Sequence, residues 1–143
     1  MINNHNFKKI LVPLDGSEFS DKALQRACEL VETFGSKIIL IYVVEKYPTL
    51  NLLDRKEYLE LLHKSGTRIL KEANNTISKK GITAKTLLKE GRIVAEIEKV
   101  SKTEKCDLII IGSRGLGSVT RFLLGSVSNK LAQSSSCSLL IVK

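Results

Sequence analysis

The stretch LIIIGSRG occupies residues 108–115 and joins an apolar run to two glycines three positions apart. The four aliphatic residues predict a strand that is buried on both faces. Gly112 and Gly115 allow the backbone to turn sharply and to approach a ligand closely. Gly125 and Ser126 follow after nine further residues, where a helical pattern begins. Because backbone N–H groups at a helix start attract anions, this layout predicts a phosphate-binding loop.

Glycine and serine also end strands and cap helices without any ligand, so a purely structural interpretation of this loop stays open. Two common phosphate loops do not fit. The Walker loop GxxxxGK[ST] requires a lysine where Ser118 stands. The dinucleotide fingerprint GxGxxG would start at Gly115, but Thr120 stands in place of its third glycine and the run follows a late strand.

Strand and helix patterns alternate along the whole chain. Apolar runs predict strands at 9–14, 37–44, 83–88, 107–111 and 138–142. Apolar residues at three- and four-residue steps predict helices at about 17–34, 52–79, 93–100 and 126–133. Alternation of this kind favours a parallel sheet with helices on both faces. We therefore expect one α/β doubly wound domain over residues 1–143, with a five-stranded parallel sheet.

The spacing Gly112-x-x-Gly115, nine residues, Gly125-Ser126 resembles the ATP-binding motif G-2x-G-9x-G-[ST] of the universal stress protein family. The run ILVPLDGS at 10–17 is similar to the opening strand and loop of that family, and CSLLIV at 137–142 is similar to its last strand. Ser138 stands where the family commonly has proline. The resemblance extends from about residue 8 to residue 143. It implies the strand order 3-2-1-4-5, an ATP site and a homodimer formed through residues 138–142.

In the order 3-2-1-4-5, the sheet reverses between its first and fourth strands, and ligands of such sheets bind outside the carboxyl ends of the strands at that point. Asp15 follows the first strand and Gly112 follows the fourth, so the topology and the motif agree. The resemblance implies ATP as the ligand, with Mg or Mn held through its phosphates and not directly by the protein. Adenine would lie near the backbone of Val43. The resemblance also assigns nucleotide contacts to Asp15, Gly112, Gly115, Gly125, Ser126 and Ser128. The Ser113 hydroxyl and the Arg114 guanidinium are further candidate donors to phosphate oxygens, and the predicted site is completed by Pro13 and Val127.

Several of these side chains also have a structural interpretation. Asp15 or Ser17 would cap the first helix, and Ser126 would cap the last one while also meeting a phosphate. Arg114, which lies in the long loop 113–124, would equally point into solvent. His63 has no carboxylate or cysteine neighbour at a telling spacing, so we expect it to be solvated.

Composition excludes some classes of protein and leaves others. The net charge is +8, but Lys and Arg are scattered and no basic stripe alternates with stacking aromatics, so a nucleic-acid partner is not expected. No apolar run approaches the ~20 residues that cross a membrane, and the polar residues 1–6 contain no signal-peptide core, so we expect a cytoplasmic protein. Cys28, Cys106 and Cys137 form no C-x-x-C pair, which argues against a disulfide framework or a zinc site.

Catalytic residues are not expected, because the chain has no paired carboxylates, no Cys–His pair at a telling spacing and no nucleotidyl-transfer motif. We expect an ATP-binding protein that acts as a nucleotide-dependent switch or sensor in stress response, with little or slow hydrolysis. The alternative is a dimeric interaction module of the same fold that binds no nucleotide. In either case the apolar edge strand 138–142 predicts pairing with a second copy, unless a loop of the same chain covers it.

Overall fold

The computed structural model describes residues 7–46, 52–116 and 124–143, and in these residues the chain forms a five-stranded sheet of order β3-β2-β1-β4-β5. All of its strand pairs are parallel. The strands are β1 (Lys9–Pro13), β2 (Lys37–Glu45), β3 (Ala84–Gly91), β4 (Leu108–Gly112) and β5 (Ser138–Val142). The helices are α1 (Glu18–Phe34), α2 (Leu52–Ser78), α3 (Ile93–Thr103) and α4 (Ser126–Ser134). The predicted fold class and strand order are confirmed.

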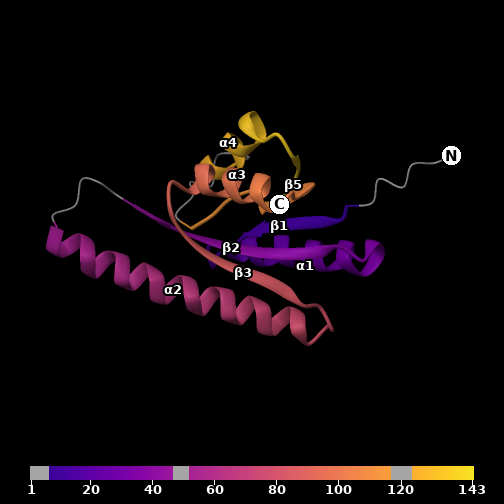
Figure 1. Cartoon of the computed structure of the whole chain (residues 1–143), viewed down its shortest axis with the longest axis horizontal. Helices are drawn as coiled ribbons and strands as arrows, with labels where there is room; N and C mark the ends of the chain where they lie inside the picture. The colour runs from indigo at the N-terminus through magenta and orange to yellow at the C-terminus, as the bar shows by residue number, and fades with distance from the viewer. Residues whose placement is uncertain (1–6, 47–51, 117–123) are drawn as a thin grey trace.

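The sheet separates two hydrophobic cores. α1 and α2 cover one face and α3 and α4 cover the other, as Figure 1 shows. Successive residues of a strand point to opposite faces, so Ile10 enters the core under α1 and α2 while Leu11 enters the core under α3 and α4. Both side chains are fully buried. This two-sided burial explains why the central strands are continuous aliphatic runs rather than alternating patterns.

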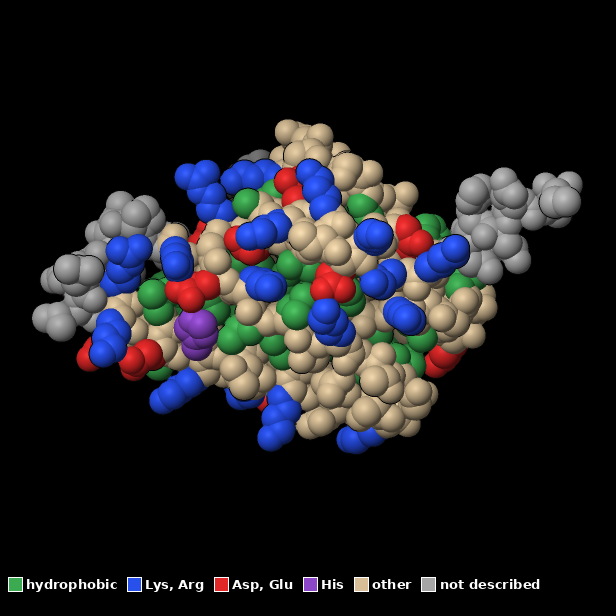
Figure 2. Space-filling view, viewed as in Figure 1, with side chains coloured by type: hydrophobic (Ala, Val, Ile, Leu, Met, Phe, Trp, Pro, Cys, Tyr) green, Lys and Arg blue, Asp and Glu red, His purple; other side chains and the backbone are tan. Residues whose placement is uncertain are grey.

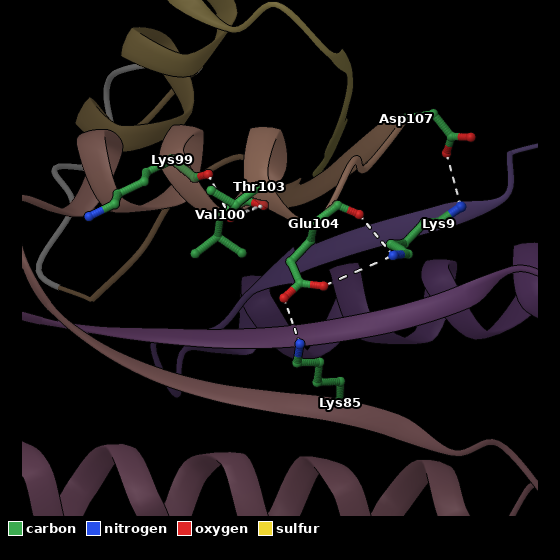
Figure 3. Close-up of polar contacts among 7 residues, drawn as sticks. All are labelled: Lys9, Lys85, Lys99, Val100, Thr103, Glu104 and Asp107. Carbon is green, nitrogen blue, oxygen red and sulfur yellow. Dashed lines mark hydrogen bonds and ion pairs between the residues drawn. The ribbon is translucent and has the colours of Figure 1, made fainter.

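The carboxylates of Glu104 and Asp107 form contacts at the amino ends of the strands, at the end of the sheet opposite the glycine loop. Asp107 accepts hydrogen bonds from the backbone N–H groups of Lys8 at 2.8 Å and Lys9 at 3.1 Å. The Glu104 carboxylate is directed between the ammonium groups of Lys9 and Lys85, as Figure 3 shows. The Lys85 Nζ–Glu104 Oε1 distance is 2.6 Å, and this hydrogen bond lowers the pKa of the Glu104 carboxyl. These contacts link β1, β3 and the start of β4 at the amino ends of the strands. The glycine loop lies at the opposite, carboxyl ends.

β2 and β3 are longer than the sequence predicts. β2 reaches Glu45 and β3 reaches Gly91, and these two residues are paired. The sequence predicted an earlier end for β3, at residue 88, because Glu-Gly-Arg at 90–92 is typical of a turn. β1, by contrast, ends at Pro13, opposite Ile41. The end of β2 therefore projects beyond its neighbour β1.

Charged side chains are spread over the face formed by β3, α2 and α3. Lys and Arg are interspersed with Asp and Glu on this face, as Figure 2 shows. Some are paired, including Arg68 with Glu72 and Lys46 with Glu90. His63 also contacts Glu90, with 3.3 Å between Nε2 and Oε2. The His63 side chain is 42% exposed, as expected of a solvated histidine. Its carboxylate neighbour Glu90 is distant in sequence, and the packing of α2 on β3 brings the two residues together.

No helix in the described part of the chain is both long and apolar enough to cross a membrane.

Gly66 sets the distance between α2 and the sheet. It is buried, and a Cβ atom at this position would lie 2.5 Å from Cδ1 of Tyr42 on β2 and 2.7 Å from Cδ1 of Leu88 on β3. Carbon atoms do not approach that closely, so only glycine allows α2 to pack at this distance.

We predict that Gly66→Val lowers the free energy of unfolding by about 1–3 kcal/mol, because the added methyl groups overpack this interface. Urea denaturation followed by circular dichroism measures the change. The control is Thr67→Val, which introduces the same side chain at the next, exposed position and should change stability by less than about 0.5 kcal/mol. Equal stability of the two variants would contradict the prediction.

Candidate functional site

A cavity of about 630 Å³ lies at the carboxyl ends of β1, β2 and β4. Its volume falls within the range of small-molecule sites. The predicted residues that line it are Pro13, Asp15, Val43, Gly112, Arg114, Gly115, Gly125, Ser126, Val127 and Ser128. Segments from both halves of the chain therefore meet at the point where the strand order reverses.

The backbone of Val43 faces this cavity because β1 stops short. The N–H of Leu14 donates to the carbonyl oxygen of Ile41 at 2.8 Å, so the peptide groups of Ile41 point toward β1. Peptide groups alternate in direction along a strand, and those of Val43 therefore point to the same side. β1 pairs with β2 only as far as Pro13, opposite Ile41. Val43 thus presents one N–H donor and one C=O acceptor beyond the end of β1.

Asp15 connects the end of β1 with the glycine loop. Its Oδ1 accepts from the N–H of Ser17 at 2.8 Å, and its Oδ2 accepts from the N–H of Leu116 at 3.1 Å. Ser17 is the N-cap of α1, with its hydroxyl accepting from the N–H of Ser20 at 3.2 Å. Of the two capping alternatives, the structure therefore selects Ser17. The Asp15 carboxylate uses two of its roughly four acceptor positions in these bonds.

Tyr42 lines the cavity on the side of α2. Burial raises the pKa of its phenol above the ordinary value, and the negative charge of Asp15 raises it further. The group is therefore a neutral O–H at physiological pH.

The three motif glycines allow close packing around the loop. A Cβ at Gly112 would lie 2.7 Å from the backbone carbon of Phe19, and one at Gly115 would lie 2.5 Å from Oδ2 of Asp15. A Cβ at Gly125 would lie 3.2 Å from Cα of Arg114. None of the three has a positive φ angle. The motif thus uses glycine for close approach rather than for an unusual backbone conformation.

The two halves of the motif are joined by the carbonyl oxygen of Ser113. It accepts from the N–H of Gly125 at 2.6 Å and from the hydroxyl of Ser128 at 2.9 Å. Ser113 itself is buried and lies behind the cavity wall, and its N–H donates to the carbonyl oxygen of Val142 at 2.7 Å. Ser113 therefore supports the site through its backbone, while the strand end and the start of α4 are held at a fixed separation.

The prediction that Ser126 caps the last helix was wrong. The N-cap of α4 is Gly125, and it makes no side-chain capping bond. Ser126 is exposed at the first helical position, and Ser128 is buried instead, with its hydroxyl also donating to the carbonyl oxygen of Gly125 at 3.1 Å. The Ser-x-Ser pattern does not show which serine is buried. If the helix began one residue earlier or later, each side chain would point about 100° away around the helix axis.

Among the described lining residues, Arg114 is the cation and Asp15 and Glu45 are the anions. The start of α4 adds partial positive charge from its N–H groups. The described residues contain no group of three or more His, Cys, Asp or Glu side chains that would hold a metal ion directly. Arg121, the other arginine of the predicted loop, lies outside the described residues.

Sequence reasoning missed part of the cavity wall. Tyr58 and Leu62 of α2 line it from one side, and Ile93 and Ile97 of α3 line it from the other. Each pair has the i, i+4 spacing of one helix face, which is the available sequence signal. That spacing identifies the buried face of a helix but not the strand end against which the face packs.

Known proteins are similar to this chain in sequence and in fold. The model of the universal stress protein family matches residues 6–143. The chain is similar to universal stress protein MJ0531 of Methanocaldococcus jannaschii, with 32% identity over 140 residues, covering 96% of this chain and 82% of that protein.

Two solved structures are similar along almost their whole length. Universal stress protein UspA from Lactobacillus plantarum has a TM-score of 0.90 at 21% identity, covers 98% of this chain and is itself covered completely, which shows the shared fold. A universal stress protein solved in complex with cAMP has a TM-score of 0.75 at 26% identity, with 96% of this chain and 98% of that one covered.

We predict that Ser128→Ala lowers the free energy of unfolding by about 1 kcal/mol, because the buried hydroxyl that the carbonyl oxygens of Ser113 and Gly125 share as a donor is lost. Ser126→Ala is the matched control two residues away, and it should change stability by less than about 0.5 kcal/mol. Thermal and urea denaturation measure both variants. A larger loss for Ser126→Ala than for Ser128→Ala would show that the capping assignment is incorrect.

Proposed function

The chain belongs to the universal stress protein family, and we propose that it binds ATP in the cavity at the carboxyl ends of β1, β2 and β4. We propose further that it acts as a nucleotide-dependent switch or sensor in stress response, with little or slow hydrolysis. The proposal rests on the observation that one cavity is lined both by peptide groups suited to a base and by a loop suited to phosphates. The open peptide groups of Val43 lie on one side, and the glycine motif with the start of α4 lies on the other.

The Val43 side suits an adenine base. An adenine edge presents an amino donor beside a ring-nitrogen acceptor, and Val43 offers the complementary carbonyl and N–H. The aliphatic side chains of Leu62, Ile93 and Ile97 supply apolar walls for a flat ring. The relative solved with cAMP, an adenine nucleotide, supports the same class of ligand.

The glycine side suits phosphates. Gly112 and Gly115 line the cavity, and the N–H groups at the start of α4 favour an anion. Arg114 would add a charge-assisted hydrogen bond. Because Asp15 and Glu45 oppose a polyanion, we propose that Mg or Mn accompanies the phosphates and reduces their charge.

The hydrogen bonds of Asp15 favour a switch over an enzyme. Both of its oxygens accept backbone N–H groups, an arrangement that suits holding the loop rather than accepting a proton from an attacking water. Three further expectations remain predictions from the sequence: one domain over residues 1–143, a cytoplasmic location and no nucleic-acid partner.

We also propose that the protein is a homodimer formed through β5. Among the described strands, β5 pairs with β4 alone, and its Leu139, Leu140 and Ile141 are half-buried. An apolar edge strand with free peptide groups favours pairing with another chain. A two-fold related copy would satisfy both edges in one interface.

We predict that calorimetric titration detects ATP binding to the wild-type protein in the presence of Mg, and that EDTA weakens it. Gly115→Val should lower the affinity at least about tenfold, because even its Cβ would collide with Asp15 and displace the loop. Thr67→Val, which introduces the same side chain at an exposed position outside the described cavity lining, should bind ATP like the wild type. The absence of heat and of a thermal shift at millimolar ATP with Mg or Mn would contradict nucleotide binding and favour the interaction module.

We predict that light scattering coupled to size exclusion gives twice the 15.9 kDa of one chain for the wild type, and one chain for Leu140→Lys. The lysine would place a charge in the middle of the proposed interface. Leu61→Lys is the control, because Leu61 is an exposed leucine on α2 away from β5. A wild-type mass of one chain at tens of micromolar protein would contradict the dimer.

A further inference from the structure

We propose that Phe19 is a positioning residue whose ring holds the Arg114 guanidinium at the phosphate end of the cavity. Through this contact Phe19 favours ligands that carry phosphates over the nucleoside alone. The inference rests on the proposed function, because it concerns a nucleotide in that cavity.

Arg114 is the cation of the described cavity wall, and among the described residues its guanidinium forms no ion pair. Its observed contact is with the ring of Phe19, with 5.9 Å between Cζ and the ring centroid. This distance is within the range of a cation–π interaction. An arginine held by a ring keeps its planar N–H donors available, whereas an arginine paired with a carboxylate has already used them.

Phe19 is a fixed platform for this contact. It lies in the first turn of α1, which Ser17 caps and Asp15 ties to the end of β1. The backbone of Phe19 packs directly on Gly112, where a Cβ would lie only 2.7 Å away. The ring is therefore carried by the same rigid elements that carry the glycine loop, so it sets the position of Arg114 relative to that loop.

A second cation on the same ring serves as an internal comparison. The Nζ of Lys22 lies 5.4 Å from the centroid of Phe19, and it also pairs with Glu18 at 3.5 Å. Lys22 is not part of the described cavity wall. The positive charge of Lys22 is thus partly neutralised locally, while that of Arg114 is available to an anion in the cavity.

Holding Arg114 in place removes part of the entropy that its long side chain would otherwise lose when it binds a phosphate. The benefit depends on phosphate groups and is absent for the nucleoside. We therefore expect an effect of Phe19 on ATP affinity but not on adenosine affinity.

The experiment is calorimetric titration of ATP with Mg, and of adenosine, into a set of variants. Phe19→Leu should weaken ATP binding about two- to fivefold, the size expected for a cation–π contact, and Arg114→Ala should weaken it about tenfold. Adenosine affinity should stay within about twofold of the wild type in both. Phe19→Tyr keeps the aromatic ring and should therefore bind ATP with wild-type affinity. Lys22→Ala should also leave the ATP affinity unchanged.

A double-mutant cycle distinguishes positioning from general packing. Phe19→Leu combined with Arg114→Ala should bind ATP like Arg114→Ala alone, because Phe19 acts through Arg114. Additive effects in the double variant, an equal loss of adenosine affinity in Phe19→Leu, or unchanged ATP affinity in that variant would each overturn the inference.

A measurement without nucleotide separates this inference from the proposed function. The NMR signal of the Arg114 Nε–H group, assigned from Arg114→Lys, should show a ring-current shift that Phe19→Leu removes. An unchanged signal would overturn the positioning contact even if ATP binds. If the wild type binds no ATP, the proposed function and the ligand preference both fail, while the NMR result still decides whether the ring holds the guanidinium.

Discussion

The placement of β1 between β2 and β4 is the constraint on which the candidate site depends. The carboxyl end of β1 lies well before that of β2, since the pairing of the two strands stops at Pro13 while β2 continues to Glu45. A parallel strand that stops early exposes peptide groups on its longer neighbour, and here these are the peptide groups of Val43, which line the cavity. The same placement puts Asp15 beside the loop that follows β4.

The loop after β4 is held by backbone contacts more than by side chains. The carbonyl of Ser113 and the carboxylate of Asp15 together accept from Gly125, Ser128 and Leu116. The Ser113 contacts lie within the connection from β4 to α4, whereas the Asp15–Leu116 contact joins segments 101 residues apart, the end of β1 and the glycine loop. A ligand in the cavity would therefore meet a preformed wall, which limits the entropy lost on binding.

The electrostatics of the cavity are unlike those of the whole chain. The protein carries a net charge of +8, yet the described wall has two carboxylates and one guanidinium. On the face formed by β3, α2 and α3, Lys and Arg side chains are scattered among acidic ones (Figure 2), and the described cavity wall contains a single arginine and no lysine. Affinity for a phosphate would thus depend on a few directed donors and on an accompanying metal ion rather than on the net charge of the protein.

The sequence by itself determined the order of strands and helices, the two-sided burial of the sheet and the glycine motif, because hydrophobic periodicity and glycine spacing are local properties of the chain. It also placed the site at the strand ends, since Asp15 and Gly112 each follow a predicted strand. Only the tertiary structure decided that Ser128 rather than Ser126 is buried at the loop, that His63 meets Glu90, and that Tyr58 and Ile93 complete the cavity wall. The physical reason is that these outcomes depend on helix phase and on strand length relative to a neighbour, and both are set by packing between segments that are far apart in the chain.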